Sequence, residues 1–158
     1  MYPELGFKEF KTQKLVIREL KKLRIPFKKM AVTGVVGLIK GAKAGKTIAL
    51  RADMDALPLT EENNKPYKSK HKGIMHACGH ENHVAILLGA AMLLSKIKKE
   101  IKGNVKLIFQ PSEEKSSDKR DGGKLMVKQG ALKNPKVDTI IGLHIGTGLN
   151  TGRVKIVY

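Results

Sequence analysis

The chain has 158 residues, which is enough for one domain with a buried core. Its 41% of hydrophobic and 28% of charged residues are ordinary for a globular protein and exclude collagen-like, low-complexity and wholly disordered chains. No apolar run approaches the roughly 20 residues that cross a bilayer, residues 1–5 lack the features of a signal peptide, and a single cysteine excludes an internal disulfide framework. We therefore expect a cytoplasmic protein with no membrane partner.

The net charge of +17, from 31 Lys and Arg against 14 Asp and Glu, raises nucleic acid as a partner. The basic residues are scattered, however, without a run of five or more, and only four Phe and three Tyr could stack on bases. We interpret the charge as a lysine-rich surface of the kind common in thermophiles. Nucleic-acid binding remains an alternative that only the charge motivates.

The first half of the chain predicts one helix followed by strands. Residues 7–23 carry apolar side chains at helical spacing, and this amphipathic helix should end before Pro26. Residues 30–39 are β-branched and broken by glycine, which predicts a strand pair or a bent strand. Residues 47–52 predict a buried strand, and the polar stretch around residues 63–66 predicts a loop.

The second half alternates helices and strands. Residues 83–101 predict a long helix that closes with lysines and at Gly103, followed by a strand over residues 105–109. A helix over residues 124–129, capped by Gly130, should follow. The remaining expected elements are a buried strand over residues 137–144 and a last strand over residues 154–158. Such alternation implies an α/β layered sheet.

Metal-capable side chains follow several of these strands. They are Asp53 and Asp55, the cluster from His76 to His83, the pair Glu113 and Glu114, and His144. Open α/β sheets place their sites at the carboxyl ends of the strands, so we expect these residues at one edge of the sheet.

Cys78 and His80 are the strongest indication of a metal site. A thiolate and an imidazole two residues apart can bind one cation, and Gly79 allows a tight backbone between them. Together with a second His and a carboxylate, they suit zinc, manganese, nickel or cobalt better than magnesium or calcium. Of Glu113 and Glu114, one could bind metal while its neighbour moves the proton of a polarised water.

Each of these residues also has a structural interpretation. A lone cysteine is usually a buried apolar side chain, and a pair of glutamates is usually solvated surface. His144 could be a structural residue after a strand, and Asp53 and Asp55 could cap a turn. The grouping of histidines around Cys78 favours the metal site, because histidine is rare and has few structural reasons to cluster.

Four ordered motifs carry a resemblance to a known family. They are the segments 51–58 (RADMDALP), 75–80 (MHACGH), 107–111 (LIFQP) followed by Glu113 and Glu114, and 142–144 (GLH). In this order and spacing they resemble the metal-dependent amidohydrolase family of aminoacylases, hippurate hydrolases and carboxypeptidases, which includes auxin-conjugate hydrolases. The resemblance implies a zinc-exopeptidase-like catalytic domain: a layered mixed sheet with helices on both faces, holding two divalent transition metal ions. We expect zinc, with manganese, cobalt or nickel as alternatives.

The resemblance also assigns roles to individual residues. Cys78, His80, Glu114 and His144 match the metal ligands of the family, and Glu113 matches its general acid/base. Asp55 matches a residue that orients a ligand. His76 and His83 lie within the same motif, but we do not expect either to bind metal.

The sequence departs from the family in three local features and in length. Glu81 replaces an aspartate, Ser112 stands where alanine is common, and residues 115–121 are charged instead of glycine-rich. Family members are more than twice as long and carry an inserted lid and dimerisation domain and a further histidine ligand. Residues 1–158 therefore match a partial, truncated catalytic domain.

These observations give one leading function and two alternatives. The leading function is metal-dependent hydrolysis of amide bonds in N-acyl amino acids or of C-terminal peptide bonds, acting on a small-molecule or peptide substrate. The first alternative is a truncated chain with weak or no activity, which could assemble with its own copies or with a complementary chain. The second is the basic nucleic-acid-binding protein considered above.

Overall fold

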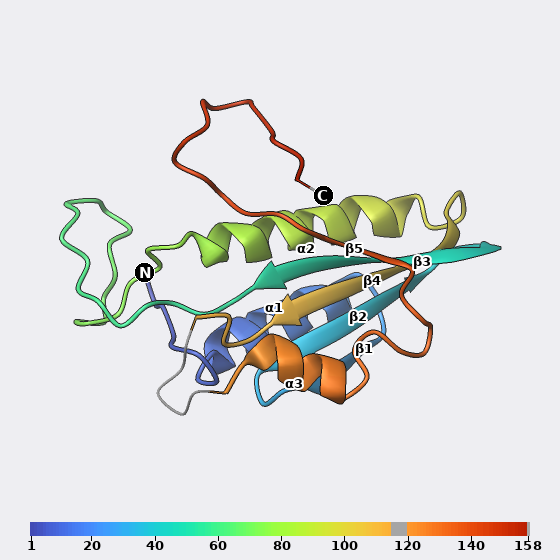
Figure 1. The fold of residues 1–158 in the computed structure, drawn as a ribbon, viewed down its shortest axis with the longest axis horizontal. Helices are drawn as coiled ribbons and strands as arrows, with labels where there is room; N and C mark the ends of the chain where they lie inside the picture. Colours follow the sequence, from blue (N-terminus) through green and yellow to red (C-terminus); the bar gives the residue numbers. More distant parts are fainter. Residues whose placement is uncertain (115–119, 158) are drawn as a thin grey trace.

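The computed structural model describes residues 1–114 and 120–157, so most of the charged segment 115–121 lies outside the described residues. Five strands in these parts of the chain form one sheet with the order β1-β2-β4-β3-β5 (Figure 1). The elements are α1 (Phe10–Lys22), β1 (Phe27–Met30), β2 (Gly34–Lys40), β3 (Lys43–Asp53), α2 (His80–Lys96), β4 (Lys102–Gln110), α3 (Gly122–Lys128) and β5 (Thr139–Gly142).

The sheet is mixed, and its parallel part brings three strand ends together. β1 and β2 form an antiparallel hairpin, and β2 is antiparallel to β4. β3 runs parallel to β4 on one side and to β5 on the other, with Asp53 opposite Gln110 and Arg51 opposite Gly142. The carboxyl ends of β3, β4 and β5 therefore meet at the same edge, as expected for a site built from strand ends.

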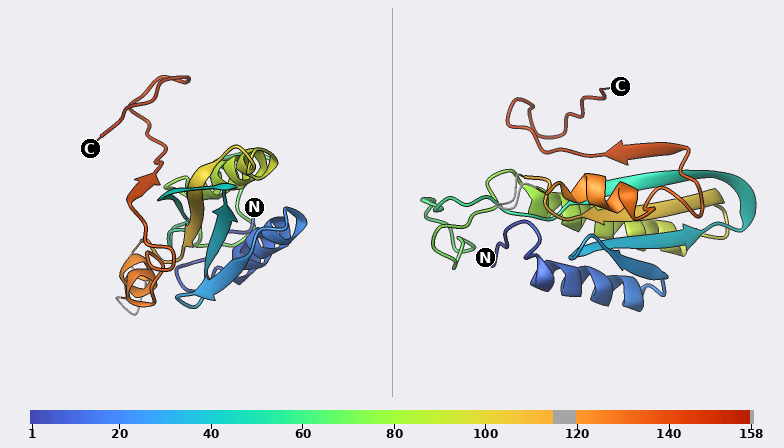
Figure 2. Two further views of the ribbon diagram at one scale, coloured as in Figure 1. Left: turned by 90° about the vertical axis from the view of Figure 1, so that its right-hand side faces the viewer. Right: turned by 60° about the horizontal axis from the view of Figure 1, so that its bottom comes forward.

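Helices cover both faces of this sheet, which confirms the predicted fold class. α1 and α2 lie on one face and α3 on the other (Figures 1 and 2). Because successive side chains of a strand point to opposite faces, β4 contributes to two cores. Leu107 and Phe109 pack in the core that includes residues of α1 and α2, whereas Ile108 packs with Met126 of α3.

The helix expected over residues 7–23 begins at Phe10 and ends at Lys22. Phe7 lies before it with a left-handed backbone (φ 59°). The carboxylate of Glu4 accepts hydrogen bonds from the backbone N–H groups of Lys11 and Thr12. This contact satisfies two of the donors that a helix start leaves free.

The long helix is shifted relative to the prediction. α2 begins at His80, three residues earlier than expected, because Gly79 adopts a left-handed N-cap conformation (φ 82°) that turns the chain directly into the helix. It ends at Lys96 rather than near residue 101. Gly103 does have a positive φ of 85°, but it lies inside β4 and does not close the helix.

The other central elements agree with the predictions. Residues 30–39 belong to a strand pair, with the hairpin turn between Met30 and Gly34. The strand expected over residues 47–52 is extended in both directions as β3. α3 begins at Gly122 after Asp121, whose side chain accepts the N–H of Lys124, and Gly130 follows the helix with a φ of 88°.

Two predictions for the C-terminal part are wrong. β5 is a strand, but all four of its residues are exposed, so the expected buried strand over residues 137–144 is not found. β5 pairs with β3, and no helix of residues 1–114 and 120–157 packs across it (Figure 2). Residues 154–157 form no strand, because the segment leads away from the sheet and pairs with no other strand of the described chain. Tyr158, the end of that prediction, lies outside the described residues.

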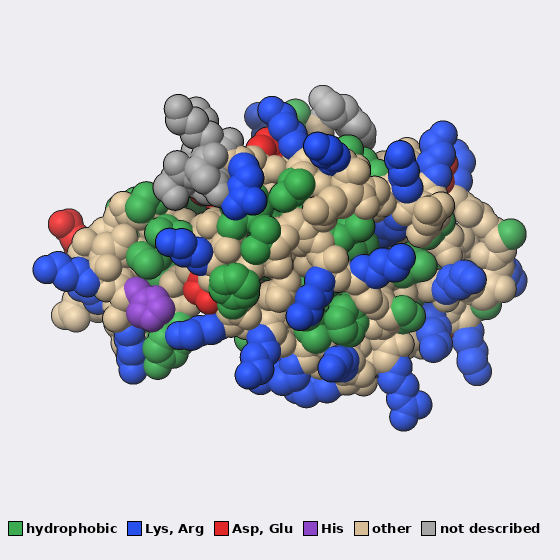
Figure 3. All heavy atoms as spheres, turned by 90° about the horizontal axis from the view of Figure 1, so that it is seen from below, with side chains coloured by type: hydrophobic (Ala, Val, Ile, Leu, Met, Phe, Trp, Pro, Cys, Tyr) green, Lys and Arg blue, Asp and Glu red, His purple; other side chains and the backbone are tan. Residues whose placement is uncertain are grey.

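The basic side chains are spread out, in agreement with the scatter seen in the sequence. On the face drawn in Figure 3, Lys and Arg side chains alternate with hydrophobic and other residues over the whole surface. Among the helices of the described residues, none has both the length and the apolar character needed to span a membrane.

Candidate metal centre

The metal-capable residues come from four segments at one edge of the sheet. Asp53 is the last residue of β3, and Asp55 follows it. Glu113 and Glu114 come shortly after β4, and His144 comes two residues after β5. Cys78 precedes α2, and His80 and His83 lie in its first turn. Parallel strands place these segments side by side because their carboxyl ends point the same way.

His80 is buried, and its two ring nitrogens have different surroundings. Its Nδ1 lies 3.1 Å from Oδ1 of Asp55 and 3.7 Å from Oδ1 of Asp53. Because a carboxylate only accepts, Nδ1 carries a proton, and in the neutral ring Nε2 presents a lone pair. In the described part of the chain this buried Nε2 has no hydrogen-bond partner.

The unpartnered Nε2 faces the glutamate pair. It lies 3.9 Å from Oε2 of Glu113 and 3.9 Å from Oε1 of Glu114. Burial acts to lower the pKa of His80, but the hydrogen bond to Asp55 and the negative charge of Asp53 together raise it. Negative charge therefore exceeds positive charge around this ring, which is the environment of a cation site.

The ligand-type atoms lie close enough to share an ion. Cys78, His80 and Glu114 could form one group, with one ligand atom from each and all three atoms within 4.8 Å of one another. Nε2 of His144 lies 3.6 Å from Sγ of Cys78. Ligand atoms around one tetrahedral transition metal ion lie about 3.5 Å apart, so small adjustments would complete the coordination.

The thiol of Cys78 lies among carboxylates. Burial, a hydrogen bond with Glu114 and the negative charges of nearby carboxylates raise the pKa of its thiol to about 11. Without a cation the thiol stays protonated at neutral pH, whereas a metal ion stabilises the thiolate. The donor set therefore fits a divalent transition metal better than it fits a metal-free site.

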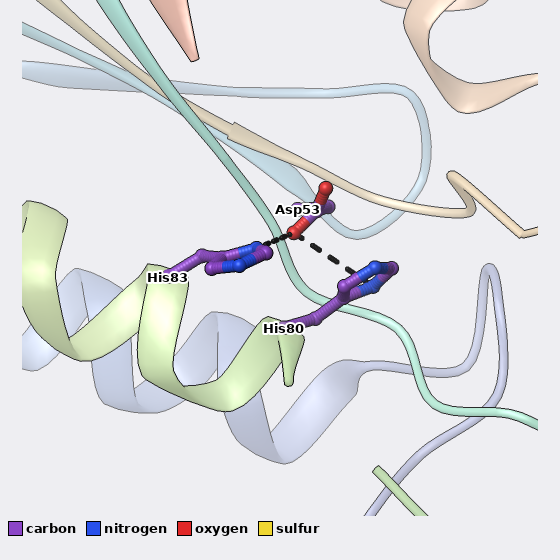
Figure 4. Close-up of side chains that lie close together, drawn as sticks. All are labelled: Asp53, His80 and His83. Carbon is purple, nitrogen blue, oxygen red and sulfur yellow. Dashed lines mark hydrogen bonds and ion pairs between the residues drawn. The ribbon is translucent and has the colours of Figure 1, made fainter. Parts of the chain in front are cut away.

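A second cluster beside the centre has a different character. Figure 4 shows the rings of His80 and His83 directed from α2 toward Asp53. Nδ1 of His83 lies 2.6 Å from Oδ1 of Asp53, whose other oxygen accepts a hydrogen bond of 2.7 Å from Arg51. Nε2 of His83 accepts the backbone N–H of Ile145 at 3.0 Å.

Both nitrogens of His83 are thus hydrogen-bonded within the protein. Asp53, His80 and His83 could also group around an ion by distance. The occupied nitrogens of His83 favour a structural role, and the expectation that it binds no metal stays a prediction. Through the Ile145 N–H, His83 also holds the residue that follows His144.

Asp55 connects the two halves of the centre. One of its oxygens contacts His80 Nδ1, and the other accepts the backbone N–H of Glu114 at 2.9 Å. The resemblance implied that Asp55 orients a ligand, and in the structure its side chain contacts His80. The glutamate side chains are less enclosed, with 40% of Glu113 and 29% of Glu114 exposed, so Glu113 can reach both His80 and solvent.

The structure brings all five predicted site residues together, although their roles stay predictions. His76 faces Glu81 instead, with Nδ1 3.6 Å from Oε2, so the substituted Glu81 contacts a histidine at the rim. Sequence reasoning placed Asp53 among the metal-capable residues, with a turn role as the alternative, and gave it no specific function. Its spacing from Asp55 was the available signal, because two residues on an extended strand share a face.

A mixed α/β sheet with a thiol, two histidines and two carboxylates at the ends of its parallel strands defines a candidate metallohydrolase. The sequence matches the profile described as Peptidase family M20/M25/M40 over residues 49–157, which is more than half of the chain. The chain belongs to this family.

Individual relatives agree with this assignment. The chain is 49% identical over 153 residues to thermostable carboxypeptidase 1 of Saccharolobus solfataricus, covering 96% of this chain and 38% of that protein. It is 46% identical over 159 residues to N-acetyl-L-cysteine deacetylase of Bacillus subtilis, covering 96% and 37%. The chain therefore spans less than two fifths of the length of these relatives.

A solved structure shows the same fold. The Bacillus subtilis YXEP protein, described as a dinuclear metal binding peptidase from the M20 family, superimposes with a TM-score of 0.82 at 42% identity. The match covers 90% of this chain and 39% of that one.

Proposed function

We propose that this chain carries the catalytic site of a metal-dependent hydrolase that cleaves the amide bond of N-acyl amino acids or a C-terminal peptide bond. The observation that carries the proposal is the buried, unpartnered Nε2 of His80, which faces a thiol and two carboxylates at the strand ends. A carboxypeptidase and an N-acyl deacetylase among the relatives support both substrate classes. The cytoplasm, which keeps thiols reduced, suits a site that needs a free Cys78.

Cys78, His80, Glu114 and His144 would hold the metal. The family contains dinuclear members, and we infer two divalent ions, with zinc favoured by the thiolate and imidazole donors. When bound, such ions polarise the amide carbonyl and make water more acidic. Asp55 keeps His80 in the tautomer whose Nε2 is free to bind.

Glu113 is the group that moves the proton. It is the more exposed member of the pair, and the backbone N–H of its neighbour Glu114 is bound by Asp55. Its carboxylate takes a proton from the attacking water and delivers it to the nitrogen of the leaving amine. Glu114 binds the metal while Glu113 moves the proton, so the two adjacent carboxylates have different roles.

The test of this division is Glu113→Gln, which keeps size and polarity but removes the base. We expect turnover of N-acyl amino acids or peptides to be lost while metal content stays at the wild-type level. Glu100→Gln, which changes an exposed residue beyond the far end of α2, is the matched control. Turnover that survives Glu113→Gln would reject the proposed function.

The first measurement is the metal content of the purified chain by elemental mass spectrometry, with and without Cys78→Ala. About one or two equivalents of a transition metal in the wild type, lost in the variant, would show that the site assembles in this chain. No metal in the wild type would favour the second candidate.

The second candidate is a partial catalytic domain that is weak or inactive until a further polypeptide completes it. Bare apolar side chains on β5 and α2 support this candidate. Ile140, Ile141, Ile86 and Leu93 are each exposed by 47–67%. The further polypeptide would be a second copy or a complementary chain that covers these side chains.

Turnover by the isolated chain distinguishes the two candidates. If the rate of hydrolysis is proportional to the concentration of the isolated chain and is lost with Cys78→Ala, the second candidate is rejected. Hydrolysis that appears only after addition of the C-terminal part of the Saccharolobus carboxypeptidase would support it.

A further inference from the structure

Glu9 is a buried carboxylate that the proposed chemistry does not use. It precedes α1, is fully inaccessible to solvent, and lies in a different segment from every predicted ligand. The donors that reach its side chain from other segments, Thr33 Oγ1 and the backbone N–H of Ser112, are both neutral. A carboxylate buried without a described cationic partner is costly, so its position calls for a reason.

The contact with Ser112 leads directly to the centre. Oε1 of Glu9 accepts the Ser112 N–H at 2.8 Å, and Ser112 is followed by Glu113 and Glu114. Ser112 has a left-handed backbone (φ 44°), which side-chain-bearing residues seldom adopt. A hydrogen bond from its N–H to a fixed acceptor helps to keep the backbone in this conformation.

The glutamate pair is thus held between two buried carboxylates. Glu9 binds the N–H of Ser112, and Asp55 binds the N–H of Glu114, so the backbone is tied on both sides of Glu113. The surroundings leave little room for movement: a Cβ added to Gly6 would lie 2.6 Å from Oγ of Ser112.

We infer that Glu9 is a positioning residue that sets the placement of Glu113 and Glu114 by binding the Ser112 N–H. It touches neither metal nor substrate. The inference rests on the proposed roles of the two glutamates. Through Glu9, the N-terminal segment would fix where they lie. Its effect should appear in metal binding through Glu114 and in turnover through Glu113.

Four variants separate this role from simple packing. Glu9→Met fills the same space without an acceptor, and Glu9→Asp keeps the charge on a side chain one methylene shorter. Glu9→Gln retains an oxygen that can accept the Ser112 N–H. Thr33→Val removes the other partner of Glu9 and leaves the Ser112 contact in place.

We expect Glu9→Met and Glu9→Asp to weaken Zn²⁺ affinity by about 10- to 100-fold, the range for residues that orient a metal ligand. Isothermal titration with Zn²⁺ measures this change. Glu9→Gln and Thr33→Val should keep wild-type affinity. In turnover assays the first two variants should lower kcat more than they change KM.

Amide hydrogen exchange at Ser112 gives a readout that depends on neither metal nor activity. The Ser112 N–H should be protected in the wild type and in Glu9→Gln, and should exchange faster in Glu9→Asp. Wild-type Zn²⁺ affinity in Glu9→Met, with only the unfolding temperature changed, would show that Glu9 is merely structural. If Glu9→Met does not fold, Glu9→Asp decides by the same criterion.

The controls also separate this inference from the proposed function. Turnover that persists in Glu113→Gln overturns the proposed function. A Ser112 amide that exchanges equally fast in the wild type and in Glu9→Asp overturns the role of Glu9, whatever the reaction.

Discussion

Lys106 and His80 are both buried polar residues of this fold, yet their hydrogen bonding differs completely. Nζ of Lys106 donates to the carbonyl oxygens of residues 131, 133 and 135 at 3.0, 2.7 and 2.8 Å. His80 uses Nδ1 and leaves Nε2 without a partner in the described chain. A buried polar group with all its bonds made holds a structure together, whereas one with a free lone pair facing carboxylates marks a site.

A cavity on the other face of the sheet does not coincide with the candidate centre. A cavity of about 420 Å³ adjoins Lys106, between the β1–β2 hairpin and the segment after α3, and none of the proposed site residues lines it. The chemistry of the donors locates the candidate centre, and the volume of the hollow does not. The same contrast between Lys106 and His80 yields four predictions.

The largest effect is expected for His80→Asn. The asparagine amide can still donate to Asp55 in place of Nδ1, but nothing replaces Nε2. Zn²⁺ affinity should fall by at least about 1,000-fold, equivalent to about 4 kcal/mol, as measured by isothermal titration. His83→Asn is the matched control, because it keeps a donor for Asp53 and removes a nitrogen that binds the Ile145 N–H. Equal losses in the two variants would contradict the contrast.

Lys106→Met should instead destabilise the fold and leave Zn²⁺ affinity unchanged. Three carbonyl oxygens lose their donor, and unsatisfied buried acceptors cost about 1–3 kcal/mol each before local relaxation. We expect the free energy of unfolding of the metal-free chain to fall by about 2–4 kcal/mol in urea denaturation. Lys102→Met, on the exposed start of the same strand, should change it by less than about 0.5 kcal/mol.

Asp55→Asn tests the link between the two halves of the centre. The carboxylate serves the His80 ring with one oxygen and the Glu114 N–H with the other, and an amide has only one oxygen to offer. Zn²⁺ affinity should fall by about 10- to 100-fold, which is less than for His80→Asn. Asp121→Asn, at the start of α3, provides a control that should not affect affinity. An unchanged affinity in Asp55→Asn would mean that His80 needs no orientation.

The sequence was sufficient to predict the parts of the centre that depend on local order. Cys78, Gly79 and His80 are adjacent in the chain, and the parallel strands β3 and β4 necessarily carry their following residues to one edge. The sheet with helices on both faces follows from the same alternation of strands and helices.

Contacts between distant segments could not be predicted in this way. Glu9 and Ser112 are 103 positions apart, and nothing in either neighbourhood signals their hydrogen bond. β5 was expected to be buried because its residues are apolar. An apolar composition favours a strand, but it does not show whether another layer of the protein covers that strand.

The smallest effect concerns the pH dependence of stability. Burial raises the pKa of Glu9 above its ordinary value of 4.5, although its hydrogen bonds to Thr33 and Ser112 act in the opposite direction. Between pH 4.5 and the folded-state pKa, Glu9 therefore retains a proton in the folded chain that it releases in the unfolded chain. The contribution of Glu9 to stability is complete below this interval and is lost as the pH rises through the folded-state pKa.

Glu9→Gln removes this titration and should become more stable relative to the wild type as the pH increases. Urea denaturation of both metal-free chains at about pH 4 and about pH 7 measures the difference, with Glu100→Gln as the exposed control. A difference that stays constant with pH would show that Glu9 has the same proton affinity in both states. A difference that grows with pH would show that the buried charge of Glu9 reduces stability at neutral pH. Glu9 would then differ from both Lys106 and His80, because it lowers stability while it holds the backbone beside Glu113.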